Sequence, residues 1–458
     1  MKKLFAVVSV LIVATLLLAA CGTTPTPAPT TAVPTEAPTV AATTEAPTPE
    51  PAGLTCTEPI KVGLITDLTG PLASYGEMIV RSFMLGMEYA AGAAGSAGEK
   101  FDWKVATQNN FKIEDCEIQV FVRDDASVPD TTTTVANELI DVQKVNILVG
   151  TTSSGATATL QGIALQNKIP LIVAPAAAND ITGVNFNEYT FRTSRNNYQD
   201  AMNECLALTK AYTKFVQIAP DYAFGRGSAA AFRDSCTLDG GTFVADDIFA
   251  PLTTTDFTPY MEQIANSGAE AYIVTWAGTG FVALIQAAED QGVTDKMALG
   301  TTFVNNAVMP ALYSNYIGTT AGIIYAYKAP QNAINDFLVA QEQARYGVVP
   351  DLFDADGMNA ALMVAAALKA TNGDVTGDVM VKAMEGMSFD GPKGLVEIRP
   401  EDHVAIQDMY ILTLENLTDP NANYYKLVDT TRPEPPCLLP ETLKSRCGSL
   451  PYGTLSGQ

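Results

Sequence analysis

The stretch IKVGLITDLTGPLASYGE, residues 60–77, gives the strongest indication of the fold. It opens with an apolar, β-branched run, Ile60–Thr66, which is typical of a buried strand. A turn-forming segment follows at 67–71, and residues 76–94 then repeat apolar side chains with the period of a helix. Strand, turn and helix in this order predict one unit of a parallel sheet covered by helices.

The same alternation continues along the chain and is interrupted twice, at 191–197 and 325–329. Helices dominate after the second break, and the last regular segments are strand-like. We therefore predict an α/β fold of two doubly wound parallel-sheet lobes, with the chain crossing between them more than once. The expected strands are 118–123, 146–150, 171–174, 215–219, 242–248, 271–275, 297–300, 394–398 and 405–414, and the expected helices are 130–142, 155–166, 225–238, 258–267, 280–290, 305–312, 332–346, 354–371 and 379–386.

The first fifty residues predict where the protein resides. Lys2 and Lys3 precede a short apolar run, 4–18, and small residues then lead to Cys21, which describes a secretory signal peptide over 1–20. The cysteine after the small pair resembles the lipobox of bacterial lipoproteins, which implies lipidation of Cys21 and a protein held outside the cytoplasm on the bacterial cell membrane. The alternative is a plain signal peptide with an incidental cysteine. Residues 21–54, rich in Thr and Pro without apolar periodicity, are expected to be a disordered tether.

The remaining body is long enough for two domains and lacks a second apolar run that could span a bilayer. The formal net charge of the whole chain is −23. Such an acidic balance argues against nucleic acid or anionic lipid as a partner, because both need clustered Lys and Arg. Contact with the membrane is therefore expected only through the lipid anchor.

The chain has seven cysteines, so lipidation of Cys21 leaves six in an oxidising compartment. Although six cysteines allow fifteen pairings, their positions favour one. Two of them directly precede neighbouring strands, two lie on consecutive helices, and two close a short loop near the end. No CxxC spacing occurs, so a zinc or thioredoxin-type site is not expected. The favoured pairs are Cys56 with Cys116, Cys205 with Cys236, and Cys437 with Cys447.

Three turns that follow predicted strands suggest a ligand site, because ligands of such sheets bind beyond the carboxyl ends of the strands. The turns are 67–71 with Tyr75, 150–155 and 174–179. The second is Gly-Thr-Thr-Ser-Ser-Gly and opens a helix, where free backbone N–H groups and hydroxyls suit a carboxylate. The alternative is that these Ser and Thr residues serve only as helix caps.

Five segments in order resemble the substrate-binding proteins of branched-chain amino-acid-type ABC transporters: IKVGLITDLTGPLASYGE, ILVGTTSSGATATL, IPLIVAPAAA, PDYAFGRG and TDFTPYMEQIANSGAEAYIV. The resemblance covers residues 59–414 and implies the type I periplasmic binding fold, two lobes joined by three crossover segments with the ligand between them. The domains so expected are an N-terminal lobe of 55–194 plus 328–388, a C-terminal lobe of 195–327 plus 389–418, and a C-terminal tail of 419–458.

The resemblance also implies roles for individual residues. Ser154 would bind the ligand carboxylate, and the carbonyl of Ala176 would face an ammonium. Ala178 stands where amino-acid binders have a threonine, and no acidic residue occurs near Thr301 and Thr302 to neutralise an ammonium. We therefore expect a carboxylate or amide ligand with an apolar or aromatic body, while a standard amino acid stays open because Asp67, Asp124, Asp125 or Asp221 could reach the cleft. The full expected ligand set is Tyr75, Thr152, Ser153, Ser154, Ala176, Ala178, Phe224, Trp276 and Thr302.

The expected mechanism is hinge closure of a monomer around its ligand, followed by docking on an ABC permease, with the breaks at 191–197 and 325–329 as hinges. A sensor that reports to a receptor would have the same fold and cleft, so the sequence leaves that alternative open.

Catalysis is not expected. Residues 278–283 and 225–230 fit GxGxxA, yet glycines at such turns are usual in this fold and no acidic residue ends the next strand. The sole histidine, His403, is expected in a solvent-facing loop rather than as a base. No GxSxG or HExxH motif is present, and no cofactor or metal is expected.

Overall fold

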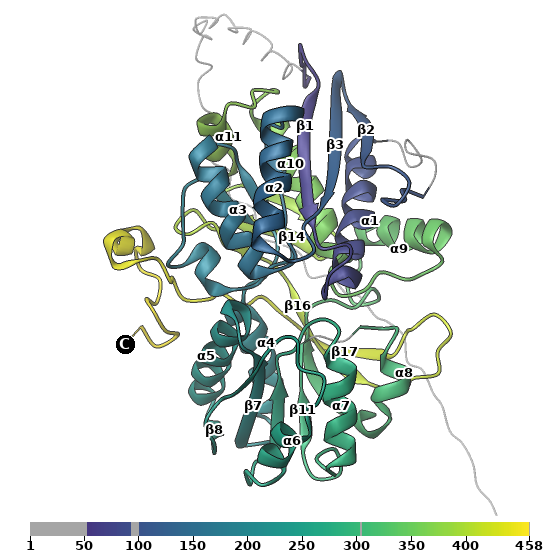
Figure 1. Ribbon diagram of the computed structural model, residues 1–458, viewed down its shortest axis with the longest axis vertical. Helices are drawn as coiled ribbons and strands as arrows, with labels where there is room; N and C mark the ends of the chain where they lie inside the picture. Colours follow the sequence, from purple (N-terminus) through teal and green to yellow (C-terminus); the bar gives the residue numbers. More distant parts are fainter. Residues whose placement is uncertain (1–52, 93–99, 303–304, 458) are drawn as a thin grey trace, which may run out of the picture. The chain divides into compact units, whose positions relative to one another are not determined.

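The computed structural model describes residues 53–92, 100–302 and 305–457, so the predicted signal peptide, Cys21 and nearly all of the tether lie outside the described residues. The first sheet has six strands in the order β2-β3-β1-β4-β5-β6, all parallel except β2, which pairs antiparallel with β3 (Figure 1). The strands are β1 (Ile60–Thr66), β2 (Gln108–Ile113), β3 (Cys116–Asp124), β4 (Ile147–Val149), β5 (Leu171–Val173) and β6 (Thr190–Arg192).

Helices from both ends of the chain pack with this sheet, and together they form what we call the N-terminal lobe. The closest pair is α1 and α10, where glycines permit the approach: a Cβ on Gly86 would lie 2.7 Å from the Cβ of Ala361. The lobe's helices are α1 (Ala73–Ala90), α2 (Pro129–Glu138), α3 (Ser154–Asn167), α9 (Ala333–Tyr346), α10 (Asp354–Ala370) and α11 (Gly377–Met384), with short turns η1 (Leu139–Gln143) and η2 (Asn179–Thr182).

The second sheet, the centre of what we call the C-terminal lobe, has the order β11-β10-β7-β8, and β9 also pairs with β7. All of these pairings are parallel. Its strands are β7 (Lys214–Pro220), β8 (Thr242–Phe243), β9 (Ile248–Ala250), β10 (Ala271–Val274) and β11 (Ala298–Gly300), and its helices are α4 (Asn197–Leu208), α5 (Ala223–Leu238), α6 (Thr258–Ala265), α7 (Phe281–Asp290), α8 (Met309–Leu312) and η3 (Ser314–Tyr316).

Two small antiparallel sheets complete the body. One joins β12 (Thr320–Ile323), β16 (Met409–Leu414) and β17 (Tyr425–Thr431), and β12 and β16 pack on α4. The other joins β13 (Ser388–Gly391), β14 (Gly394–Ile398) and β15 (Ala405–Ile406), and β13 packs on α9 and α10. The chain passes between the lobes after β6, after β12 and between β15 and β16, while the exact lobe boundaries stay a prediction.

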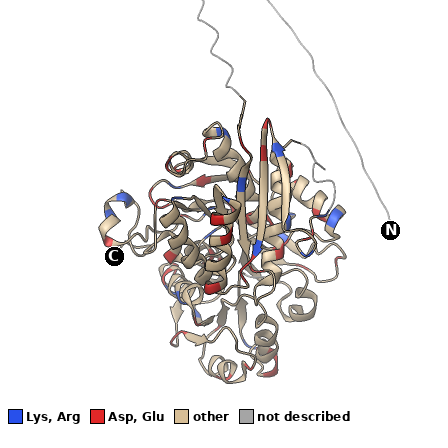
Figure 2. Cartoon of the chain, turned by 45° about the horizontal axis from the view of Figure 1, so that its top comes forward, with Lys and Arg blue, Asp and Glu red and all other residues tan. Residues whose placement is uncertain are grey.

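The predicted α/β fold with parallel sheets is confirmed, and so are the three disulfides, Cys56–Cys116, Cys205–Cys236 and Cys437–Cys447. The first joins Cys116, the first residue of β3, to Cys56, which lies four residues before the neighbouring strand β1. In the described part of the chain, no helix is long and apolar enough to cross a membrane. Figure 2 shows Lys and Arg interspersed with Asp and Glu over the described residues.

Candidate ligand site

A narrow cavity lies where the carboxyl-end turns of both sheets meet. Its wall comes from the turns after β1, β4 and β5, the first crossover, and the turns after β7 and β10, together with the start of α10. Its free volume is only ≈ 20 Å³. One water molecule needs about 10–15 Å³, so the cavity is little larger than a single water. The wall residues are Leu72, Tyr75, Thr152, Ser154, Pro175, Ala176, Ala177, Arg195, Tyr222, Phe224, Ala277 and Phe353.

Five of the nine predicted ligand residues lie on this wall: Tyr75, Thr152, Ser154, Ala176 and Phe224. The other four, Ser153, Ala178, Trp276 and Thr302, are buried and do not line it. Trp276, predicted to contact the ligand, does not line the cavity, because its ring is fully buried and packs edge-on against Phe257, with centroids 4.8 Å apart.

The Ser154 corner is built to donate hydrogen bonds. Ser154 begins α3, so the backbone N–H groups of this first helical turn have no partner within the helix. The Ser154 hydroxyl oxygen accepts a hydrogen bond from Ala178 N at 3.2 Å, which orients its own O–H to donate elsewhere. Beside it, the Thr152 hydroxyl is hydrogen-bonded to that of Thr66 at 2.5 Å. This arrangement favours an acceptor such as a carboxylate oxygen.

Two guanidinium groups donate hydrogen bonds to backbone carbonyl oxygens of the turn that follows β5. Arg192 donates to the carbonyl oxygens of Ala176 and Ala178, both at 2.5 Å, and Arg195 donates to that of Pro175 at 2.6 Å. Burial lowers the pKa of Arg192 to about 9, so its side chain still carries a positive charge at neutral pH. The Ala176 carbonyl, which the resemblance assigns to a ligand ammonium, is thus next to a cation.

Aromatic rings form the apolar part of the wall. Tyr75 and Phe353 meet edge to face with centroids 5.0 Å apart, and Tyr222 and Phe224 lie 5.9 Å apart. The Arg195 guanidinium lies 5.0 Å from the centre of the Phe353 ring. Burial raises the pKa of Tyr75 to about 12, so its hydroxyl stays protonated. The wall therefore combines a polar, cationic end with an aromatic body.

The two lobes touch each other around the cavity. Gly278 N in the C-terminal lobe donates to the Tyr75 hydroxyl at 3.3 Å, and Asn306 N donates to Asp351 Oδ2 at 2.9 Å. On another side, the Asn179 side chain donates to the Gly227 carbonyl at 3.3 Å. These contacts and the small free volume describe closed lobes, so a ligand can enter only when the lobes separate.

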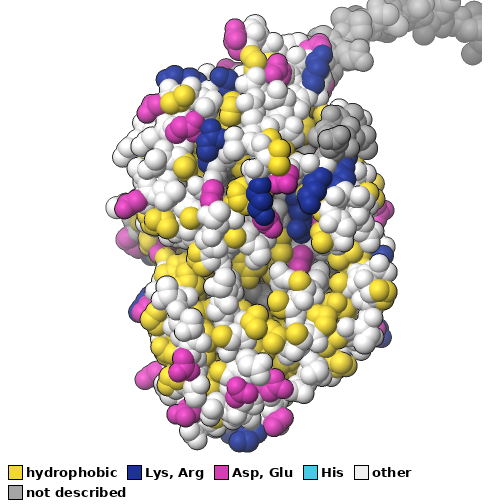
Figure 3. Space-filling model, turned by 45° about the vertical axis from the view of Figure 1, so that its right-hand side comes forward, with side chains coloured by type: hydrophobic (Ala, Val, Ile, Leu, Met, Phe, Trp, Pro, Cys, Tyr) yellow, Lys and Arg dark blue, Asp and Glu magenta, His cyan; other side chains and the backbone are white. Residues whose placement is uncertain are grey.

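A larger cavity of ≈ 570 Å³ lies next to this site, between α1, the end of α9, and the loops 305–307 and 420–424. Ser74 and Asp351 line it, whereas their neighbours Tyr75 and Phe353 line the narrow cavity. Figure 3 shows this face hollowed, with basic side chains beside the hollow, and Arg81, Lys100 and Lys104 line the adjoining depression. The first turn of α1 also faces the larger cavity through Ser74, but none of the nine predicted ligand residues lines that cavity.

The sequence analysis missed seven wall residues: Leu72, Pro175, Ala177, Arg195, Tyr222, Ala277 and Phe353. Pro175 and Ala177 belong to the predicted turn at 174–179, Leu72 directly follows the turn at 67–71, Tyr222 lies in the segment PDYAFGRG, and Ala277 directly follows Trp276. Arg195 lies in a segment expected only as a hinge, and Phe353 directly precedes an expected helix. No local pattern in those segments signals that the chain returns to the cavity.

The expectation for His403 is wrong. Its ring is fully buried, stacks on Phe191 with centroids 4.0 Å apart, and contacts Glu385 at 3.2 Å. Burial lowers the pKa of His403, although hydrogen bonds to the Thr190 carbonyl and the Glu385 carboxylate act in the opposite direction, and the ring is a packing group in the crossover region. Among the described residues, no group of His, Cys, Asp or Glu side chains is arranged to hold a metal ion.

Comparison with known proteins agrees with this arrangement. A family profile described as "Periplasmic binding protein" matches residues 59–419. The Leu/Ile/Val-binding protein homolog 6 of Brucella melitensis is 27% identical over 381 residues, covering 80% of this chain and 90% of that relative.

Two solved structures from Rhodopseudomonas palustris are also similar. A protein described as an ABC-type branched-chain amino acid transporter is 32% identical, with a TM-score of 0.67, covering 81% of this chain and 96% of the other. A solute-binding protein of an ABC transporter, solved in complex with benzoate, is 26% identical, with a TM-score of 0.69, covering 82% of this chain and 97% of the other.

Proposed function

The chain belongs to the periplasmic binding protein family, and from this premise we propose that it captures a small aromatic carboxylate by lobe closure and delivers it to an ABC permease. The observation that carries the ligand class is the position of Arg192, whose guanidinium occupies the Ala176 and Ala178 carbonyls. A ligand ammonium there would meet a buried positive charge, whereas a carboxylate would be attracted by it.

The rest of the wall supports the same ligand. The first turn of α3 and the Ser154 hydroxyl offer hydrogen-bond donors to a carboxylate, and the rings of Tyr75, Phe224 and Phe353 offer an apolar surface to an aromatic body. A benzoate-bound relative with 26% identity is consistent with this pairing of chemistry and fold.

Closure is the proposed mechanism. The separated lobes would expose the Ser154 corner, and a ligand that contacts both lobes would shift the population towards the closed form. The closed form would then dock on the permease as a monomer. We further propose that Cys21 carries lipid and that the protein acts outside the cytoplasm, tethered to the membrane.

A branched-chain amino acid is the second candidate, because a relative with 32% identity is described as a branched-chain amino acid transporter. It requires a partner for the ammonium. No acidic residue is next to Thr301 and Thr302 in the sequence, but the Glu204 carboxyl contacts the Thr301 N–H group in the structure. Glu204, or one of Asp67, Asp124, Asp125 and Asp221, would have to supply it.

Isothermal titration calorimetry separates these candidates. The protein, unfolded and refolded to remove bound molecules, is titrated with benzoate, 4-hydroxybenzoate, benzamide and leucine. We expect the two acids to bind at least about tenfold more tightly than leucine, because an ammonium beside buried Arg192 costs more than about 1.4 kcal/mol. Benzamide reports what the negative charge adds. Leucine binding more tightly than either acid would overturn the assignment.

A further inference from the structure

We propose that residues 432–457, here called the strap, bridge the two lobes and restrain their opening, which regulates ligand release from the proposed site. The family profile matches residues 59–419, so the strap lies outside the residues that it matches. The inference depends on the proposed function only for the ligand, since the restraint itself concerns the lobes alone.

The strap is anchored to the N-terminal lobe by Arg446, in the short helix η4 (Glu441–Cys447). Its guanidinium donates to Glu385 Oε1 at 2.6 Å and to the carbonyl oxygens of Pro400 and Glu401 at 2.7 and 2.9 Å. It also lies 5.1 Å from the centre of the Phe186 ring. Burial opposes ionisation of Glu385, yet hydrogen bonds from Arg446 and His403 outweigh it and lower the pKa of Glu385.

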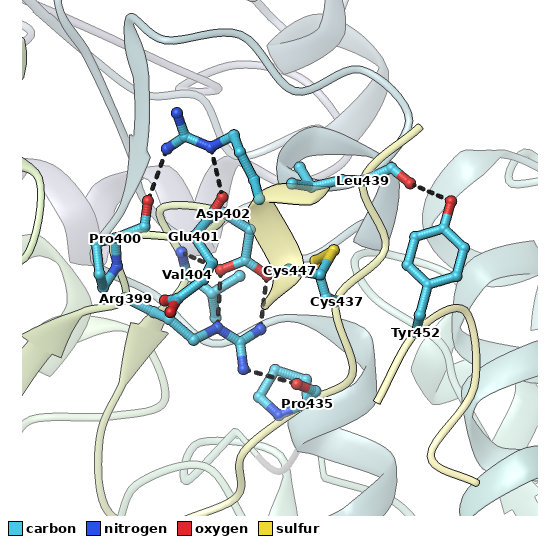
Figure 4. Close-up of a disulfide and its surroundings, with 11 residues drawn as sticks. Arg399, Pro400, Glu401, Asp402, Val404, Pro435, Cys437, Leu439, Cys447 and Tyr452 are labelled. Carbon is cyan, nitrogen blue, oxygen red and sulfur yellow. Dashed lines mark hydrogen bonds and ion pairs between the residues drawn. A yellow bond between two sulfur atoms is a disulfide. The ribbon is translucent and has the colours of Figure 1, made fainter. Parts of the chain in front are cut away.

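Two carbonyls of the strap are held beside the crossovers. Gln199 of α4 donates to the Pro433 carbonyl at 3.2 Å, and Arg399, after β14, donates to the Pro435 carbonyl at 2.8 Å. Arg399 is itself fixed by Asp402, with its Nη2 and the carboxylate 2.6 Å apart. Figure 4 shows the disulfide of the strap between this Arg399–Asp402 pair on one side and Tyr452 on the other.

The strap also contacts the C-terminal lobe. Leu455 N donates to Asp234 Oδ2 of α5 at 2.8 Å, and the same carboxylate oxygen accepts from the Tyr198 hydroxyl of α4 at 3.0 Å. Leu438 and Leu455 pack against the apolar core beneath α4 and α5. Leu438 also touches the N-terminal lobe, because a Cβ added to Gly183 would lie 3.1 Å from its Cβ.

The disulfide between Cys437 and Cys447 joins these attachments into one unit. Cys437 is next to Leu438, which packs on the C-terminal lobe, and Cys447 is next to Arg446, which binds the N-terminal lobe. Both cysteines are buried in a small core of their own with Leu439. If the lobes separate on this side, the strap must either lose its contacts with one lobe or deform. Because both changes cost free energy, the strap favours the closed form.

Hydrogen–deuterium exchange in the full-length, ligand-free protein tests the restraint. Peptides that contain Gly278 report opening, because its amide donates to Tyr75 only when the lobes touch. We expect Cys437→Ser/Cys447→Ser and Arg446→Gln each to raise the exchange rate there about five- to tenfold, by loss of contacts specific to the closed form. Release of bound 4-hydroxybenzoate, followed by stopped flow, should accelerate by a similar factor of about five to ten.

Two control variants separate restraint from stability. Cys56→Ser/Cys116→Ser removes a disulfide within the N-terminal lobe, and Lys444→Gln removes an exposed charge from the same short helix as Arg446. Both should leave exchange at Gly278 unchanged. Strap variants that fold, as judged by circular dichroism, without faster exchange at Gly278 would overturn the proposal. If the strap variants exchange faster at Gly278 but the protein does not bind 4-hydroxybenzoate, the restraint by the strap is supported and the proposed ligand is rejected.

Discussion

The class of ligand that we propose depends on single residues of the cavity wall. What matters is which of their hydrogen-bond donors and acceptors already have a partner within the protein. Ser154 has its oxygen occupied by Ala178 N, and the Ala176 carbonyl is occupied by Arg192. The first leaves a donor for a ligand, and the second places a positive charge beside the carbonyl that would face an ammonium. Together they change the ligand expected from this fold from an amino acid to an acid without an ammonium.

Replacing Ser154 with Ala should weaken binding of 4-hydroxybenzoate about tenfold, because one hydrogen bond to a charged group contributes roughly 1.5 kcal/mol. Ser153→Ala is the matched control, since Ser153 precedes it in the same turn but is not on the cavity wall. Calorimetry should give a change of less than about twofold for the control. Equal losses in both variants would contradict the role given to Ser154.

Glu204 predicts a pH dependence of stability. Burial raises its pKa to about 8, although the N–H groups of Gly322 and Thr301 act in the opposite direction. Between the unfolded pKa of 4.5 and about 8, the folded protein retains a proton that the unfolded chain has lost. The free energy of unfolding should therefore fall as pH rises through this window, by up to roughly 5 kcal/mol from this group.

Urea unfolding of wild type and Glu204→Gln at pH 5, 6, 7 and 8 measures this effect. The variant should lose most of the slope, because an amide does not titrate. Glu262→Gln, on an exposed position of α6, should keep the wild-type slope. The interpretation fails if the slopes of wild type and Glu204→Gln coincide.

How well the sequence predicts single residues depends on how local their environment is. Ser154, Thr152 and Phe224 follow strands directly, so strand position alone brings them to the sheet edge. Arg195 and Phe353 reach the cavity only through the path of the chain between the lobes, which no local pattern encodes. Trp276 also ends a strand, yet its size and apolar character turn it into the core against Phe257.

At the scale of elements, the closing contact is made by two turns. The turn after β10 places Gly278, with φ +83°, against the turn before α1. A Cβ at Gly278 would lie 2.6 Å from the Pro71 carbonyl oxygen and 2.8 Å from Leu72. Closure thus needs glycine here for both its conformation and its size.

Gly278→Ala should hold the lobes apart and weaken ligand binding about tenfold or more. Gly292→Ala is matched to it, because Gly292 also has a positive φ, +64°, but has open space around it. Each should lose about 1 kcal/mol of stability from backbone strain. Only Gly278→Ala should weaken binding in calorimetry, and similar affinities of the two variants would contradict the closing contact.

Periodic elements were predicted well and edge strands were not. The central strand β1 was predicted with its observed bounds, because both of its faces are buried and its residues other than Lys61 and Thr66 are apolar. β2 and β17 were missed, since both are antiparallel edge strands with mostly exposed, polar residues. Short strands such as β12 and β13 depend on pairing with distant segments, which a single sequence does not reveal.

At the scale of the whole body, residues 53–457 with their two gaps, the proposed function needs two states. The lobes touch in one state and are separated in the other. The lobes touch around a cavity with ≈ 20 Å³ of free volume, so the closed form excludes the ligand from entering or leaving. Ligand exchange therefore depends on how often the lobes separate, which the strap is proposed to control. Although the formal net charge is −23, the buried guanidinium of Arg192 lies at the Ala176 carbonyl of the cavity wall, whereas Arg195 is paired with Asp200.

A crystal structure of the protein with 4-hydroxybenzoate tests the central claim most directly. The account predicts the carboxylate within hydrogen-bond distance of the Ser154 hydroxyl and the first turn of α3, with the ring between Tyr75, Phe224 and Phe353. A carboxylate found instead in the larger cavity beside Arg81, with the Ser154 corner still closed by the protein's own side chains, would contradict it.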